Sequence, residues 1–157
     1  MKISITKLLL VITLSSTTFL MGFANTDKLI AQAKKDTAEI EPKALKKMLD
    51  DEDDVIIVDV RESEQRAEGE IVTNDSYFSI TRGNLEFEIG KKIDDKDAFI
   101  VTYCRGGSRG ALAAQTLRKL GYKNATNLKG GLKAWTKAGY SIKTGLGITT
   151  LVTEKKE

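Results

Sequence analysis

Two runs of apolar residues stand out along the chain and predict buried strands. Residues 55–60 form a β-branched run that only Asp59 interrupts. Residues 99–103 form a second run, which ends directly before Cys104. Continuous apolar runs of this length are typical of parallel strands that are covered on both faces of a sheet.

Helical spacing of apolar residues predicts the elements that cover this sheet. A helix is expected over residues 42–49, because proline is well suited to a first helical turn. A second helix is expected from about Ser108, with Gly121 placed to end it. A last helix follows Gly130-Gly131.

Weaker patterns predict the remaining elements, and the alternation of strands and helices predicts the fold class. We expect short strands at Ile40 and at residues 76–80, 125–127 and 148–152, a short charged helix at 62–68, and a helix or turn at 83–92. The fold class is therefore α/β, with a central, mostly parallel sheet flanked by helices on both faces.

The first 24 residues have the pattern of a secretory signal peptide. Lys2 and Lys7 precede an apolar stretch, and Gly22 and Ala24 supply the small residues of a cleavage site. We therefore expect a periplasmic protein without stable membrane association after cleavage. The alternative is an uncleaved leader that anchors the chain in a membrane, although the stretch is short and rich in hydroxyl groups for a span.

Composition places the rest of the chain among ordinary globular proteins. Of the 157 residues, 41% are hydrophobic and 30% are charged, and the formal net charge is only +3. This balance gives no support for nucleic-acid binding. We expect an N-terminal extension at residues 25–37, one domain at 38–143 and a C-terminal tail at 144–157.

Cys104 is the only cysteine, and the chain has no histidine. A single cysteine in an exported protein indicates a reactive thiol or an intermolecular link; a buried, inert thiol is the alternative. Without histidine the thiol has no Cys-His partner, and neither a zinc cluster nor a Cys-x-x-Cys motif can form within the chain. We expect no metal and no cofactor, and activation of the thiol by backbone dipoles and arginine.

The residues after the cysteine have the composition of an anion-binding loop at a helix start. Gly106 and Gly107 permit positive φ values, which a nest of backbone N–H groups requires. Arg105 is expected to face the entrance and attract anionic donors, and Arg109 to brace the loop or contact substrate oxyanions. Ser108 is expected to cap the helix or to bind substrate.

Four segments together resemble a single-domain rhodanese. They are Asp59-Val60-Arg61-Glu62, Gly69-Glu70-Ile71, the loop from Cys104 to Arg109, and Leu128-Lys129-Gly130-Gly131-Leu132-Lys133-Ala134-Trp135. The resemblance covers residues 38–143 and implies a sulfurtransferase. In that family the cysteine takes the outer sulfur of a donor such as thiosulfate, becomes a persulfide, and passes the sulfur to an acceptor such as cyanide or a thiol.

Other residues of the resembling segments are assigned supporting roles. Asp59 is expected to accept hydrogen bonds from the loop after it, and Arg61 to form an ion pair. Glu70 stands where many family members have histidine, so no role is transferred to it.

Two other functions remain open from the sequence. A cysteine phosphatase or arsenate reductase would use a similar cradle, but its loop is one residue longer; here four residues separate Cys104 from Arg109. A non-catalytic periplasmic sulfur carrier would use the same thiol and deliver its persulfide only to a protein partner.

Overall fold

The computed structural model describes residues 25–73 and 76–151. The chain divides into two units, residues 1–32 and residues 33–157. The described part of the first unit is helical, and residues 33–37 of the second unit are helical as well. Within the described ranges no helix is long and apolar enough to cross a membrane. The expected leader, residues 1–24, lies outside them.

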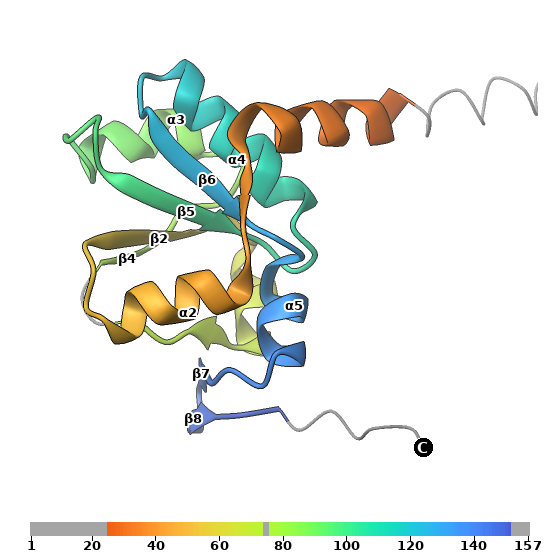
Figure 1. The fold of residues 1–157 in the computed structure, drawn as a ribbon, viewed down its shortest axis with the longest axis vertical. Coiled ribbons are helices and arrows are strands. Elements are labelled where there is room, and N and C mark those ends of the chain that lie inside the picture. Colours follow the sequence, from red (N-terminus) through yellow and green to blue (C-terminus); the bar gives the residue numbers. More distant parts are fainter. Residues whose placement is uncertain (1–24, 74–75, 152–157) are drawn as a thin grey trace, which may run out of the picture. The chain divides into compact units, whose positions relative to one another are not determined.

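Five parallel strands form the central sheet of the second unit (Figure 1). In spatial order they are β1 (Glu39–Ile40), β6 (Asn124–Leu128), β5 (Phe99–Tyr103), β2 (Val55–Asp59) and β4 (Tyr77–Ser79). The two long apolar runs are the neighbouring strands β2 and β5, as predicted, and both are covered on two faces. Their register pairs Asp59 with Tyr103, so both strands end at the same carboxyl edge.

Helices cover both faces of this sheet, which confirms the α/β class. On one face α3 (Leu85–Glu88), the 3₁₀ turn η2 (Ile89–Lys91) and α4 (Ser108–Lys119) contribute to one buried apolar cluster. On the other face α2 (Pro42–Asp50) and α5 (Gly131–Lys137) contribute to a second cluster. Tyr103 belongs to the second cluster and Cys104 to the first, because successive residues of a strand point to opposite faces.

A second, three-stranded antiparallel sheet was not predicted. It consists of β3 (Glu70–Ile71), β7 (Ile142–Thr144) and β8 (Gly147–Thr149). The expected strand at 148–152 is wrong in extent, since β8 ends at Thr149 and pairs with β7 in a hairpin that begins at Ile142. In the turn, Thr144 Oγ1 accepts a hydrogen bond from Leu146 N and donates one to Gly147 O. This local bonding sets the hairpin register.

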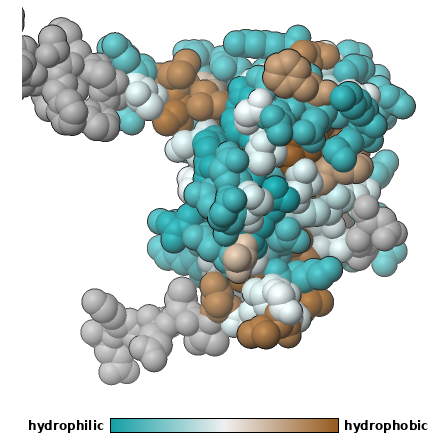
Figure 2. All heavy atoms as spheres, turned by 180° about the vertical axis from the view of Figure 1, so that it is seen from behind, coloured by the Kyte–Doolittle hydropathy of each residue, from teal (hydrophilic) through white to brown (hydrophobic). Residues whose placement is uncertain are grey.

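The hairpin carries an apolar surface. Figure 2 shows apolar side chains at the lower end of the molecule, where Figure 1 places β7 and β8. The exposed large residues of this segment are Leu146, Ile148 and Leu151. Residue 152, the end of the expected strand, lies outside the described ranges.

Candidate active site

Cys104 lies directly after β5, at the carboxyl edge of the parallel sheet, where ligands bind in α/β folds. Its side chain is 3% exposed, and Sγ accepts a hydrogen bond from Gly107 N at 3.2 Å. Gly107 precedes the first residue of α4 and has a left-handed φ of 94°. Backbone N–H groups at a helix start carry partial positive charge, and one of them is directed at the sulfur atom of Cys104.

The rest of the loop differs from its prediction in two places. Gly107 has a positive φ but Gly106 does not, and a Cβ at Gly106 would meet open space. Ser108 is the first residue of α4 and makes no capping hydrogen bond. Gly107 occupies the cap position instead, because its left-handed backbone turns N–H toward Sγ.

The start of α5 fixes the backbone of the cysteine loop. Leu132 N donates to the Cys104 carbonyl at 2.9 Å, and Lys133 N donates to the Arg105 carbonyl at 3.0 Å. This contact requires glycine at 131, where an added Cβ would lie 2.2 Å from the Cys104 oxygen. The sequence contained a signal for this contact, the glycine pair before the last helix, but the pattern alone did not show what approaches it.

The two arginines of the loop contact a short 3₁₀ helix, η1 (Ser63–Glu68). Arg105 Nε lies 2.8 and 2.9 Å from the two carboxylate oxygens of Glu68. Arg109 Nη2 donates to Gln65 Oε1 at 2.6 Å. Gln65 and Glu68 were not predicted as site residues, since nothing local to η1 indicates that it packs against a loop about 40 residues later.

A buried ion pair holds η1 in place. Asp59 and Arg61 have fully buried side chains, and Arg61 Nη2 lies 2.6 Å from Asp59 Oδ2. Arg61 also donates to the carbonyls of Gln65 at 3.0 Å and Gly69 at 2.7 Å. These two carbonyls bracket the second half of η1, so Asp59 and Arg61 support the helix that the loop arginines contact.

Two tyrosines complete the network around Asp59. Tyr103 Oη and Tyr77 Oη donate to Asp59 Oδ2 at 2.8 and 2.9 Å. Burial by itself would raise the pKa of Asp59, but the hydrogen bonds and charge of Arg61 outweigh it, and the pKa is lowered. The pKa values of Tyr77 and Tyr103 are raised, first by burial and then by the charge of Asp59. The network therefore holds an ionised carboxylate and two neutral phenols at neutral pH.

A surface hollow of about 280 Å³ adjoins the cysteine loop. Its lining residues are Glu68, Arg105, Leu132, Lys133, Thr136 and Leu151. They combine charged groups of both signs with two leucine side chains. A small anion would fill only part of this volume, whereas an organic molecule could occupy the rest.

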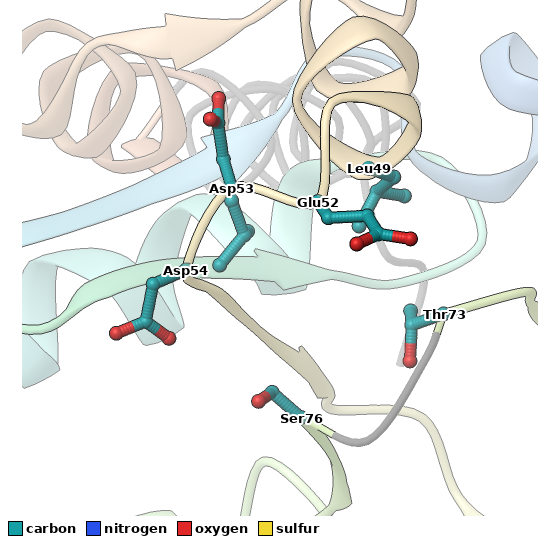
Figure 3. A pocket seen from close by; sticks show the side chains of 7 residues that line it. Leu49, Glu52, Asp53, Asp54, Thr73 and Ser76 are labelled. Carbon is teal, nitrogen blue, oxygen red and sulfur yellow. The ribbon is translucent and has the colours of Figure 1, made fainter.

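A different hollow, of about 240 Å³, lies at the opposite end of β2 and away from Cys104. Figure 3 shows its acidic residues, Glu52, Asp53 and Asp54, with carboxylates that point in different directions. They do not converge on one ligand position. Among the described residues, no group of three or more acidic or cysteine side chains is arranged to hold a metal ion.

The chain was compared with known proteins. The sequence profile of the rhodanese-like domain matches residues 41–138. A sulfurtransferase from Allochromatium vinosum is 32% identical over 104 residues, which cover 66% of this chain and 92% of the relative.

Two solved structures extend the similarity. A homodimeric polysulfide-sulfur transferase from Wolinella succinogenes superposes with a TM-score of 0.65 at 28% identity, over 85% of this chain and 93% of that chain. A Rhodopseudomonas palustris protein of unknown function, described as a possible tyrosine phosphatase, superposes with a TM-score of 0.64 at 30% identity, over 74% and 92%.

The ion pair predicts a specific acid sensitivity. Because the folded-state pKa of Asp59 is lowered, its contribution to stability is present above about pH 4 and is lost as the pH falls through the folded-state value. Asp59→Asn leaves Arg61 buried without its partner and should lower the free energy of unfolding by about 3–5 kcal/mol at neutral pH. Urea denaturation at several pH values should show that the difference in unfolding free energy between the wild type and Asp59→Asn becomes smaller as the pH falls from neutral to acidic. Asp54→Asn, at an exposed position, is the control. If the destabilisation by Asp59→Asn were the same at every pH, the lowered pKa of Asp59 would be contradicted.

The close approach of α5 predicts a geometric effect on the thiol. Gly131→Ala should displace the cysteine loop, weaken the Gly107–Sγ hydrogen bond and slow alkylation of Cys104 by iodoacetamide about tenfold, since a hydrogen bond to a charged group contributes roughly 1.5–3 kcal/mol. Gly139→Ala is a matched control, because Gly139 also has a positive φ but no atom within 4 Å of an added Cβ. Equal alkylation rates in both variants would show that backbone strain alone, and not the contact, matters.

Proposed function

This chain belongs to the rhodanese-like domain family, and from that premise we propose that it is a sulfurtransferase in which Cys104 carries the transferred sulfur. The sulfurtransferase relative from Allochromatium vinosum supports the reaction class. The observation that carries the assignment to Cys104 is the Gly107 N–H bond to Sγ, at the junction of β5 and α4. A thiolate held there has the nucleophilicity that attack on a sulfur–sulfur bond requires.

Thiosulfate is the proposed donor. The Cys104 thiolate attacks the outer sulfur, a new Sγ–S bond forms, and the sulfur–sulfur bond of the donor breaks. Sulfite leaves with the electron pair of that bond, and a persulfide anion remains on Cys104. The Arg109 guanidinium, from the first turn of α4, is positioned by Gln65 to balance the charge of the donor oxygens.

Cyanide or a thiolate is the proposed acceptor. Cyanide attacks the outer sulfur of the persulfide, the Sγ–S bond breaks, and thiocyanate leaves while the Cys104 thiolate is regenerated. The backbone hydrogen bonds from α5 hold the Cys104 and Arg105 carbonyls through both half-reactions. The loop therefore needs no rearrangement between them.

Export is part of the proposal. The basic start, apolar stretch and small residues of positions 1–24 support a cleaved signal and a periplasmic location. Mature protein from the periplasmic fraction should begin at Asn25, which N-terminal sequencing checks. A full-length chain recovered with the membrane fraction would favour the anchored alternative.

Sulfur loading of Cys104 is the decisive test of the proposed function. After exposure to thiosulfate, intact-mass measurement should show the addition of one sulfur atom to the wild-type chain. Cys104→Ser should show no addition, because it lacks the nucleophile. Cyanide should then remove the added sulfur and release an equal amount of thiocyanate.

Other outcomes would point to the two alternatives. An adduct that cyanide and small thiols never discharge would replace the enzyme with a sulfur carrier that serves a protein partner. No adduct with any sulfane donor, together with hydrolysis of a phosphate ester, would overturn the proposal in favour of a phosphatase. The four-residue gap between Cys104 and Arg109 argues against that result, because a shorter loop leaves less room for a tetrahedral phosphate.

A further inference from the structure

The two arginines of the cysteine loop differ in the charge of their partners. Arg109 bonds the neutral amide of Gln65, whereas Arg105 bonds the carboxylate of Glu68. Arg109 therefore keeps its full positive charge toward solvent, and the charge of Arg105 is partly balanced. Of the two, Arg105 is adjacent to Cys104 in sequence.

The helical geometry of η1 explains why both partners reach the loop. A 3₁₀ helix has three residues per turn, so Gln65 and Glu68 lie above one another on the same face. Arg61 bonds the carbonyls of Gln65 and Gly69, on either side of Glu68. The position of Glu68 is thus set by the buried ion pair and not by its exposed contact with Arg105 alone.

Glu68 brings negative charge to the place where an anionic donor approaches. Glu68 and Arg105 line the hollow beside the loop together with Lys133, and their side chains are 41% and 49% exposed. Such an exposed ion pair adds little to folding stability. Its carboxylate does, however, reduce the local positive potential that concentrates anions at a site.

We propose that Glu68 is a specificity-determining residue that disfavours doubly charged donors such as thiosulfate relative to singly charged alkyl persulfides. It acts through Arg105, whose side chain it positions and whose positive charge it partly balances. This inference rests on the proposed sulfurtransferase function. With an alkyl persulfide the Cys104 thiolate attacks the outer sulfur, the sulfur–sulfur bond breaks, and the alkyl thiolate leaves with the electron pair. The proton state of the transferred sulfur is unchanged.

Exchange of charge on η1 tests the proposal in both directions. Glu68→Gln should raise kcat/KM for thiosulfate about threefold to tenfold, mostly through a lower KM, the size expected for one nearby charge in a solvent-exposed site. Sulfur loading from methyl persulfide should change less than twofold. Gln65→Glu should have the opposite effect on thiosulfate, because it places a carboxylate on Arg109. Glu64→Gln removes the same charge from the exposed side of η1 and should have no effect.

Salt and a second pair of reagents separate an electrostatic role from a structural one. The effect of Glu68→Gln should disappear near 1 M salt, where the screening length is about 3 Å. The ratio of alkylation rates with iodoacetate and iodoacetamide should also rise in Glu68→Gln, since these reagents differ mainly in charge.

The possible failures are distinct. Sulfur loading that is absent with every donor would overturn the proposed function itself. Normal loading with equal donor preference in wild type and Glu68→Gln, or a change that persists in high salt, would overturn only the role of Glu68.

Discussion

The buried ion pair between Asp59 and Arg61 is the constraint on which the rest of the site depends. Both side chains are fully removed from solvent, which is costly for two charges unless every donor and acceptor is satisfied. Asp59 meets this requirement with hydrogen bonds from Arg61, Tyr77 and Tyr103, and Arg61 with two further carbonyls. The pair thereby joins β2, β4 and β5 to η1. Such a network stabilises one arrangement of these segments, because any other arrangement leaves a buried charge unpaired.

Cys104 itself is positioned by backbone atoms. Sγ receives an N–H group from Gly107, and the carbonyl of Cys104 receives one from Leu132. Two glycines make this possible, since a Cβ at Gly131 would collide with the Cys104 carbonyl and one at Gly107 would lie only 3.1 Å from Gly130 N. The charged side chains around Cys104 are therefore not needed to hold the loop and contribute mainly to the electrostatic potential at the site.

The central fold could be predicted because its signals are local and strong. The apolar runs of β2 and β5 and the helical stripe of α4 each indicate one element without reference to the rest of the chain. The second sheet was missed because its strands have two or three residues and one of its two pairings, between Ile71 and Ile142, spans a long sequence distance. Gln65 and Glu68 were missed for the same reason. The capping role expected of Ser108 was wrong because the sequence rule for caps does not anticipate a glycine whose N–H is committed to a sulfur atom; its role in substrate binding stays a prediction.

The site combines a buried ion pair, Asp59 and Arg61, with more exposed polar side chains on η1. Substitutions in these two parts have different effects. Gln65 and Glu68 project from a helix whose backbone is held by Arg61, so their side chains can be exchanged without removing a contact of Asp59. A change of one unit of charge at either position alters the potential at the thiol but removes no buried contact. Substitutions of Asp59 or Arg61 remove buried contacts instead, because they release η1 and, with it, both arginines of the cysteine loop. On the proposal made for Glu68, donor preference and thiol reactivity are governed by different residues, although η1 connects them in space.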